Sequence, residues 1–325
     1  MRTWLISLGA VLGLLLAAAE ASAVNEEGLA ELTEKNECAD ITLAYPVFGI
    51  QEIDNGVSSW AESYFRETVE DYQQYCLEDP DFREKSAAWN LSVTARELKS
   101  TPGTVSIYFS LYGYSGAVPP NQGAETLVLD MEGKRLGFDD LFGNTEGLWD
   151  FLSERVKADM RRRAKQNGGL PGPDSLTVAP KPESFKHFLV TPKGLTLIFT
   201  DVQAADDSVG ELRIDVSLNA LAGFNPQPGL WADPTAAQPA FDCAKQANRV
   251  EAEICANPIL ARCDEVMAKE YELVQEVVDK EALKKEQDLW RERMQSQCDS
   301  DSASLCILEH YTLRLAKLRG IKAAL

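Results

Sequence analysis

The chain has 325 residues, of which 45% are hydrophobic and 26% charged, and its formal net charge is −19. This composition is typical of globular proteins, and a chain of this length predicts about two domains. The acidity argues against nucleic acid and anionic membranes as partners, because both would repel it. Two interpretations of the acidity remain open: attraction of a basic partner, or the solubility of an exported protein.

The first 23 residues have the pattern of a removable secretory signal peptide. Arg2 supplies a positive start, an apolar run extends from Leu5 to Ala19, and Ala21-Ser22-Ala23 forms the cleavage site. The apolar run is about 15 residues long, whereas a membrane-spanning helix needs roughly 20. We therefore expect a mature protein that begins near Val24, has no membrane anchor and is periplasmic or secreted.

Alternating apolar residues and helical periodicity predict an α+β domain over residues 24–224. The expected strands are Asp40–Phe48, Trp89–Leu98, Thr104–Tyr114, Glu125–Asp130, Phe185–Val190, Leu195–Thr200 and Leu212–Leu218. The expected helices are Asn55–Cys76 and Glu146–Arg163. Met131–Lys134 and Thr191–Gly194 are predicted turns. We expect an antiparallel sheet with helices packed against it.

Four stretches of this domain also resemble the ectodomain of RsiV-like anti-sigma factors, over about residues 41–221. They are Tyr45-Pro46, SLYGYSGA at 110–117, LDMEGKRLGFDDLF at 129–142, and GLTLIFTDVQ followed by LRIDV at 194–216. The resemblance implies a lysozyme-binding domain. The chain departs from the family at residues 115–118, where the family tends to have Gly-Gly-Ala-His, and at residues 205–207, where it tends to have Ala-Pro-Tyr.

The loop after the third expected strand is our candidate partner-binding segment in this domain. Its candidate residues are Tyr114, Ser115, Val118 and Asn121. The glycine and prolines of residues 114–121 favour a projecting loop that loses little entropy on docking. An ordinary hairpin connection is the alternative, and the sequence leaves both open.

Residues 225–240 are rich in proline, glycine and alanine, and we interpret them as a linker between domains. Residues 241–325 then read as a small all-α module of three helices. Asn257-Pro258 is a good helix start, because asparagine is a preferred N-cap and proline is favoured at the next position. The three helices carry apolar stripes at helical spacing. Their positions are Leu260, Cys263, Met267, Tyr271, Val274 and Val278; Leu283, Gln287, Trp290 and Met294; and Leu305, Leu308, Tyr311, Leu315 and Leu318.

This module resembles the LprI-type lysozyme-inhibitor domain of secreted and periplasmic bacterial proteins. The matching residues are Phe241-Asp242-Cys243-Ala244, Glu251, Ile254-Cys255, Pro258, Leu260, Asp264, Tyr271, Gln287, Trp290, Arg293, Cys298, Cys306, Tyr311, Arg314-Leu315 and Leu318. The resemblance implies a protein that binds other proteins on the envelope side of the cell and is not an enzyme. For Trp290 and Tyr311, core packing is the simpler interpretation, and ligand contact is the alternative.

Seven cysteines in an exported chain are expected to pair in disulfides, with one left over. We predict Cys38–Cys76, because the first precedes a strand and the second ends a helix. We predict Cys298–Cys306, which brackets the turn between the second and third helices, and Cys243–Cys255, which brackets the entry to the first. Crossed pairings stay possible on sequence alone. Cys263 is then unpaired, as a small buried apolar residue.

No catalytic, metal or cofactor motif is recognisable in the sequence. The chain has two histidines, His187 and His310, without metal-ligand neighbours at useful spacing. We therefore expect no enzyme and no cofactor.

The two resemblances together predict a binding protein for lysozyme-like muramidases, which are basic proteins, and leave open whether binding also inhibits them. The alternative is an accessory envelope protein that binds peptidoglycan or another envelope protein. The sequence leaves the binding domain undetermined.

Overall fold

The computed structural model describes residues 24–78, 89–114, 121–167, 178–200, 211–232, 237–299 and 303–324. The expected signal peptide, residues 1–23, lies outside the described residues, as do Ser115 and Val118. Among the described residues, no helix combines the length and apolarity needed to cross a membrane.

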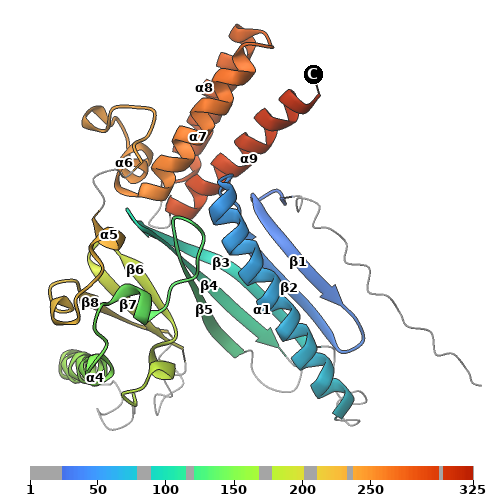
Figure 1. The fold of residues 1–325 in the computed structure, drawn as a ribbon. Coiled ribbons are helices and arrows are strands. Elements are labelled where there is room, and N and C mark those ends of the chain that lie inside the picture. Colours follow the sequence, from blue (N-terminus) through green and yellow to red (C-terminus); the bar gives the residue numbers. More distant parts are fainter. Residues whose placement is uncertain are drawn as a thin grey trace, which may run out of the picture.

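The first part of the chain forms a five-stranded sheet with the strands in chain order and a long helix on one face (Figure 1). Its elements are β1 (Leu29–Lys35), β2 (Ala39–Pro46), α1 (Gln51–Glu78), β3 (Trp89–Thr101), β4 (Thr104–Tyr114) and β5 (Asn121–Asp130). Neighbouring strands are antiparallel except β2 and β3, which are parallel. The sheet is therefore mixed and not purely antiparallel, because α1 carries the chain back along the sheet before β3 begins.

Alternation along β4 divides the sheet into two faces. Val105, Ile107 and Phe109 are fully buried beside α1, where Phe109 packs on Trp60 with ring centroids 4.5 Å apart. Ser106 and Tyr108 point to the opposite face. The alternation predicted from the sequence thus directs successive side chains of β4 to opposite faces of the sheet, and both faces are buried.

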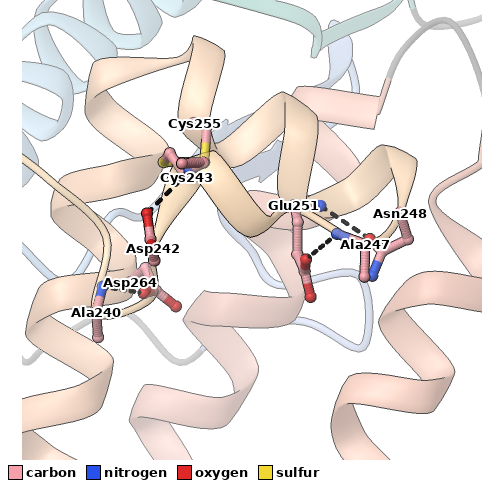
Figure 2. Close-up of a disulfide and its surroundings, with 9 residues drawn as sticks. Ala240, Asp242, Cys243, Ala247, Asn248, Glu251, Cys255 and Asp264 are labelled. Atoms are coloured by element: carbon pink, nitrogen blue, oxygen red, sulfur yellow. Dashed lines mark hydrogen bonds between the residues drawn. A yellow bond between two sulfur atoms is a disulfide. The ribbon is translucent and has the colours of Figure 1, made fainter.

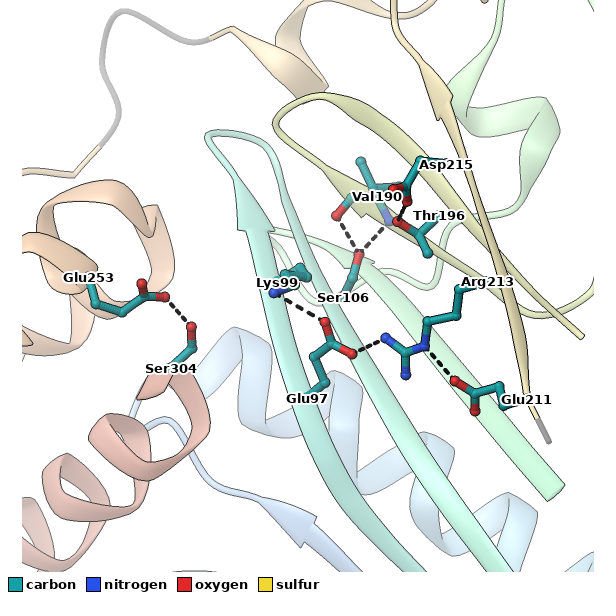
Figure 3. Close-up of polar contacts among 10 residues, drawn as sticks. All are labelled: Glu97, Lys99, Ser106, Val190, Thr196, Glu211, Arg213, Asp215, Glu253 and Ser304. Atoms are coloured by element: carbon teal, nitrogen blue, oxygen red, sulfur yellow. Dashed lines mark hydrogen bonds and ion pairs between the residues drawn. The ribbon is translucent and has the colours of Figure 1, made fainter. Parts of the chain in front are cut away.

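A second, three-stranded antiparallel sheet covers that opposite face, and a helix packs against its other side. These elements are α3 (Phe138–Leu141), α4 (Leu148–Asn167), η1 (Pro182–Phe185), β6 (Phe188–Thr191), β7 (Gly194–Phe199), β8 (Leu212–Ser217), η2 (Ala222–Phe224) and α5 (Pro228–Trp231). Ser106 joins the two sheets by hydrogen bonds with the backbone of Val190, 3.2 Å to its oxygen and 3.0 Å to its nitrogen (Figure 3). The α+β class expected from the sequence is confirmed.

The C-terminal module consists of helices that stand at the end of the first sheet where α1 begins (Figure 1). They are η3 (Cys243–Lys245), α6 (Arg249–Ala256), α7 (Pro258–Gln275), α8 (Lys280–Gln297) and α9 (Ala303–Ala323). The three long helices are the expected ones, and α6 is an additional short helix. The disulfides are Cys38–Cys76, Cys243–Cys255 and Cys298–Cys306, and Cys263 is a buried free thiol, as predicted.

One continuous apolar core joins this helical module to the sheet. It includes Phe48 and Ile107 from the sheet side together with Cys263, Leu308 and Leu315 from the helices. Polar contacts link the same two parts. The hydroxyl of Ser100 donates to the Asn257 side chain, and that of Thr312 donates to the backbone oxygen of Val47. Asn257 is the N-cap of α7 as expected, but its side chain binds Ser100 and makes no capping hydrogen bond.

The segment interpreted as a linker has defined structure where it is described. Pro226 forms a β-bridge with Phe142, and Trp231 at the end of α5 is buried and donates to the backbone oxygen of Thr191 at 3.1 Å. Residues 225–232 therefore pack on the first part of the chain.

Candidate functional site: an acidic aromatic pocket in the helical module

An open pocket of about 420 Å³ lies among the C-terminal helices. We call it the Trp290 pocket. Its wall is formed by Phe241, by residues of α6 and α7, and by the face of α8 that carries Trp290. Tyr311 from α9 lies at the bottom, where it is 1% exposed. All four helices of the module therefore contribute to one cavity.

The floor of the pocket is a buried carboxylate with two donors. Asp264 is 6% exposed, and its oxygens accept hydrogen bonds from the Tyr311 hydroxyl at 2.8 Å and the Ala240 backbone N–H at 2.7 Å. Burial raises the pKa of the Asp264 carboxyl, and the two donors offset that effect only in part. Burial and the neighbouring Asp264 charge also raise the pKa of Tyr311. The bond from Tyr311 joins α7 to α9 at the pocket floor. The bond from Ala240 joins α7 to the segment before η3 (Figure 2).

The wall on the side of α6 is held by local hydrogen bonds and a disulfide (Figure 2). Asn248 caps α6 by accepting from the N–H of Glu251 at 2.9 Å, and the Glu251 carboxylate accepts from the N–H of Ala247 at 2.6 Å. The two bonds resemble a capping box, except that the Glu251 carboxylate binds the N–H of the residue before the N-cap. Since Cys243 is bonded to Cys255 in α6, the chain after Phe241 is tied to the same wall.

On the side of α8, the buried arginine Arg314 holds two residues of the helix in place by hydrogen bonds. Arg314 donates to the Gln287 oxygen at 2.8 Å and to the Glu286 carboxylate at 2.9 Å. Gln287 in turn donates to the sulfur of Met267 at 3.2 Å. The indole N–H of Trp290 donates to the backbone oxygen of His310 at 3.2 Å, so its donor is already used within the protein.

The charges that line the pocket are unequal. Three carboxylates, Glu251, Asp264 and Glu272, face one cation, Arg291. Arg291 also lies 3.7 Å from Asp288, which is outside the pocket. Beside these charges stand the half-buried rings of Tyr271 and Trp290. Such a pocket favours a ligand that combines positive charge with apolar surface.

Eight of the 17 residues that line the pocket are among those on which the sequence analysis based the resemblance to the LprI-type domain. These are Phe241, Glu251, Ile254, Asp264, Tyr271, Gln287, Trp290 and Tyr311. Tyr311 is a core residue, as the simpler interpretation held. Trp290 is half-buried and packs against the same core, and both residues also line the cavity. Glu272 and Gln275 were not recognised as site residues from the sequence. The sequence did offer one signal: both residues lie at helical spacing from Asp264, Ala268 and Tyr271, and therefore on the same face of one helix.

The two described residues of the candidate partner-binding segment, Tyr114 and Asn121, are at the other end of the sheet. Tyr114 ends β4 with 44% of its surface exposed, and Asn121 begins β5 opposite Gly113. A hairpin joins β3 to β4, and Ser100 beside this hairpin contacts Asn257 at the start of α7. Tyr114 is at the opposite end of β4, so the full length of β4 separates it from the helical module. The two candidate surfaces are therefore far apart.

A second cavity, of about 290 Å³, lies between the sheet and the start of α9 and is lined by Glu97, Lys99, Arg213 and Ser304. The charges of Glu97, Lys99 and Arg213 are satisfied internally (Figure 3). Arg213 bonds to both Glu97 and Glu211, and Lys99 lies 3.1 Å from Glu97. Burial tends to raise the pKa of Glu97, but the bond and charge of Arg213 outweigh it and lower the pKa. This cluster is better explained as a contact between the two sheets.

Within the described residues, the one cluster of three potential metal-ligand groups consists of Cys298, Cys306 and His310. The two cysteines are joined in a disulfide, which removes both thiolates as ligands. Burial, followed by the charge of Arg293, lowers the pKa of His310. His187 lies in a different place, with Nδ1 3.7 Å from the carboxylate of Glu125.

The solved structures to which the chain is weakly similar include two DUF3298 family proteins. The chain is similar to a DUF3298 family protein from Pseudomonas aeruginosa PAO1, with 17% identity, 63% of this chain and 94% of the other covered, and a TM-score of 0.43. It is also similar to a DUF3298 family member from Bacteroides fragilis NCTC 9343, with 15% identity, coverage of 60% and 91%, and a TM-score of 0.36. No family model and no curated protein matches the chain. Similarities of this size assign no function.

Proposed function

We propose that this protein is an extracytoplasmic, non-catalytic binding protein that recognises a lysozyme-like muramidase. The observation that carries the proposal is the Trp290 pocket. Eight of the residues on which the resemblance to a lysozyme-inhibitor domain rests line this one open, acidic and aromatic cavity.

The charge of the whole chain supports the same kind of partner. The net charge is −19, and lysozymes are typically basic, so opposite charges would accelerate the encounter more than they deepen the affinity. A complex of ordinary size would bury on the order of 1,600 Å² in total. Inhibition would follow if the bound protein covered the pair of catalytic carboxylates with which such enzymes cleave the glycan.

Three disulfides accord with an oxidising compartment, where such bonds form and persist. Export is tested by the intact mass of the protein recovered from the envelope fraction. We expect loss of residues 1–23. Retention of the full chain in the membrane would contradict the proposed location.

The function is tested by titrating the mature protein with purified c-type and g-type lysozymes in a calorimeter and in a cell-wall lysis assay. We expect binding to at least one type, and slower lysis if the active cleft is covered. Absence of binding to either type would overturn the proposal. Binding to isolated peptidoglycan in its place would favour an accessory envelope role.

The loop at the end of β4 is tested separately. If it carries the contact, replacing Tyr114 and Ser115 with alanine weakens binding of the muramidase. Unchanged affinity in a folded double variant would leave the helical module as the contact surface.

A further inference from the structure

We propose that the Trp290 pocket is a receptor for one cationic side chain, an arginine or a lysine, that a protein partner inserts. The identity of the partner rests on the proposed function, but the pocket's preference for a cation rests on its own geometry. Its volume of about 420 Å³ is within the roughly 300–1,000 Å³ typical of ligand pockets and is ample for a long side chain.

The acceptors for such a side chain are on two facing walls. Glu272 on α7 is exposed, and no described residue forms a hydrogen bond or ion pair with it. On α6, the carboxylate of Glu251 accepts from the Ala247 N–H through Oε2, and no described donor meets its Oε1. The amides of Gln275 and Gln295, which also line the pocket, add further acceptors.

The aromatic side chains favour a cation over a neutral polar group. The Trp290 N–H is bonded to His310 and is not available to donate to a ligand. Trp290 therefore contributes the aromatic ring of its indole to the pocket lining. Tyr271 lies on the facing helix. A guanidinium or ammonium group over such rings is attracted by their π electrons, while its aliphatic stem covers apolar surface.

The same features disfavour an anionic glycan or a free carboxylate. Three acidic groups outnumber Arg291, and Arg291 is drawn toward Asp288 outside the pocket. Asp264 is not a ligand group in this proposal, because both of its oxygens are occupied by Tyr311 and Ala240. It holds the floor, and Glu251 and Glu272 receive the cation.

The experiment uses the methionines as local reporters. The chain has five, of which Met267 and Met294 line the pocket while Met131 and Met160 lie elsewhere. Mature protein labelled with ¹³C in the methionine methyl groups is titrated with N-acetyl-arginine amide at low ionic strength. N-acetyl-citrulline amide, which has nearly the same shape without the charge, is the control ligand.

We expect the Met267 and Met294 signals to shift with the arginine compound, and the Met131 and Met160 signals to stay in place. Citrulline should give little effect. Glu251→Gln/Glu272→Gln should weaken arginine binding by about tenfold. The matched control is Glu281→Gln/Glu292→Gln, which removes the same charge from a different groove on α8 and should bind as the parent does. Absence of pocket shifts, or equal shifts with citrulline, would overturn the proposal.

A second arm separates this proposal from the proposed function. The parent and both double variants are titrated with the c-type and g-type lysozymes. Loss of affinity in the pocket variant alone supports both proposals. Equal affinity in all three proteins refutes insertion of a cation into the pocket while the muramidase function stands. Pocket shifts with the arginine compound but no lysozyme binding would support the pocket and refute the muramidase function.

Discussion

Replacing Tyr311 with phenylalanine tests whether the pocket floor depends on one hydrogen bond. The Tyr311 hydroxyl donates at 2.8 Å to Asp264, and both residues are buried. In the variant, Asp264 retains only the Ala240 N–H among the donors described. Hydrogen bonds to charged groups contribute about 1.5–3 kcal/mol, so we expect a loss of about 2 kcal/mol in the free energy of unfolding at neutral pH.

The loss should depend on pH in a defined direction. Burial raises the pKa of Asp264 above its ordinary 3.8, so the folded protein binds this proton more tightly than the unfolded chain does. The contribution of this carboxyl to stability is therefore most favourable in acid and declines as pH rises through the window above 3.8. The Tyr311 hydroxyl stabilises the ionised form, so the cost of removing it is full above that window and shrinks as the carboxyl is protonated.

Urea unfolding of the parent and variant at neutral and mildly acidic pH measures both effects. Tyr271→Phe is the matched control, because it removes the same atom from the same pocket and no hydrogen bond of that hydroxyl is described. We expect the control to change stability by less than about 0.5 kcal/mol. Equal effects of the two variants, or a Tyr311→Phe cost that does not change with pH, would refute this account of the floor.

Three further outcomes are expected. Arg213→Gln should destabilise the protein by about 1–3 kcal/mol, because it leaves Glu97 without its main partner. The lowered pKa of Glu97 contributes stability above the unfolded pKa that is lost as pH falls, so the parent and variant should converge in acid in denaturant titrations. Replacing Cys243 and Cys255 with serine should cost about 2–5 kcal/mol and weaken binding of the arginine compound, as calorimetry and the methyl spectra would show. Oxidation of the thiol of Cys263 should be negligible without denaturant in mass spectra, because burial raises its pKa.

Much of the fold could be predicted because local patterns determine it. The bounds of β4 match the alternating run from Thr104 to Tyr114, and the turn at 131–134 contains Gly133 at φ +83°. There a side chain would meet the backbone of Glu52 in α1. By contrast β1 was not predicted. Its sequence, LAELTEK, is poor in the aromatic and β-branched residues typical of strands. Its pairing with β2, which is a tertiary contact, stabilises it as a strand.

The pocket could not be predicted, because it depends on how four helices are placed. The sequence shows that Asp264 and Tyr311 occupy apolar helix faces, which is equally consistent with an ordinary core. Only the packing of α7 on α9 shows that Asp264 is bonded to Tyr311 and that Trp290 and Glu272 border open space. Disulfides were predictable because their partners are close in sequence, with separations of 8 to 38 residues.

Helix α7 connects the sheet to the pocket. On one side, the Cys263 thiol lies 3.5 Å from the backbone oxygen of Phe48, and Asn257 holds Ser100. The next residue, Asp264, forms the pocket floor. Because the sheet fixes one face of the helix, the other face presents its carboxylates and rings with little freedom left to lose on binding. A preformed receptor gains affinity chiefly by avoiding that ordering cost. In the function proposed above, the sheet would therefore support recognition by the helices even though Tyr114 lies at its far end.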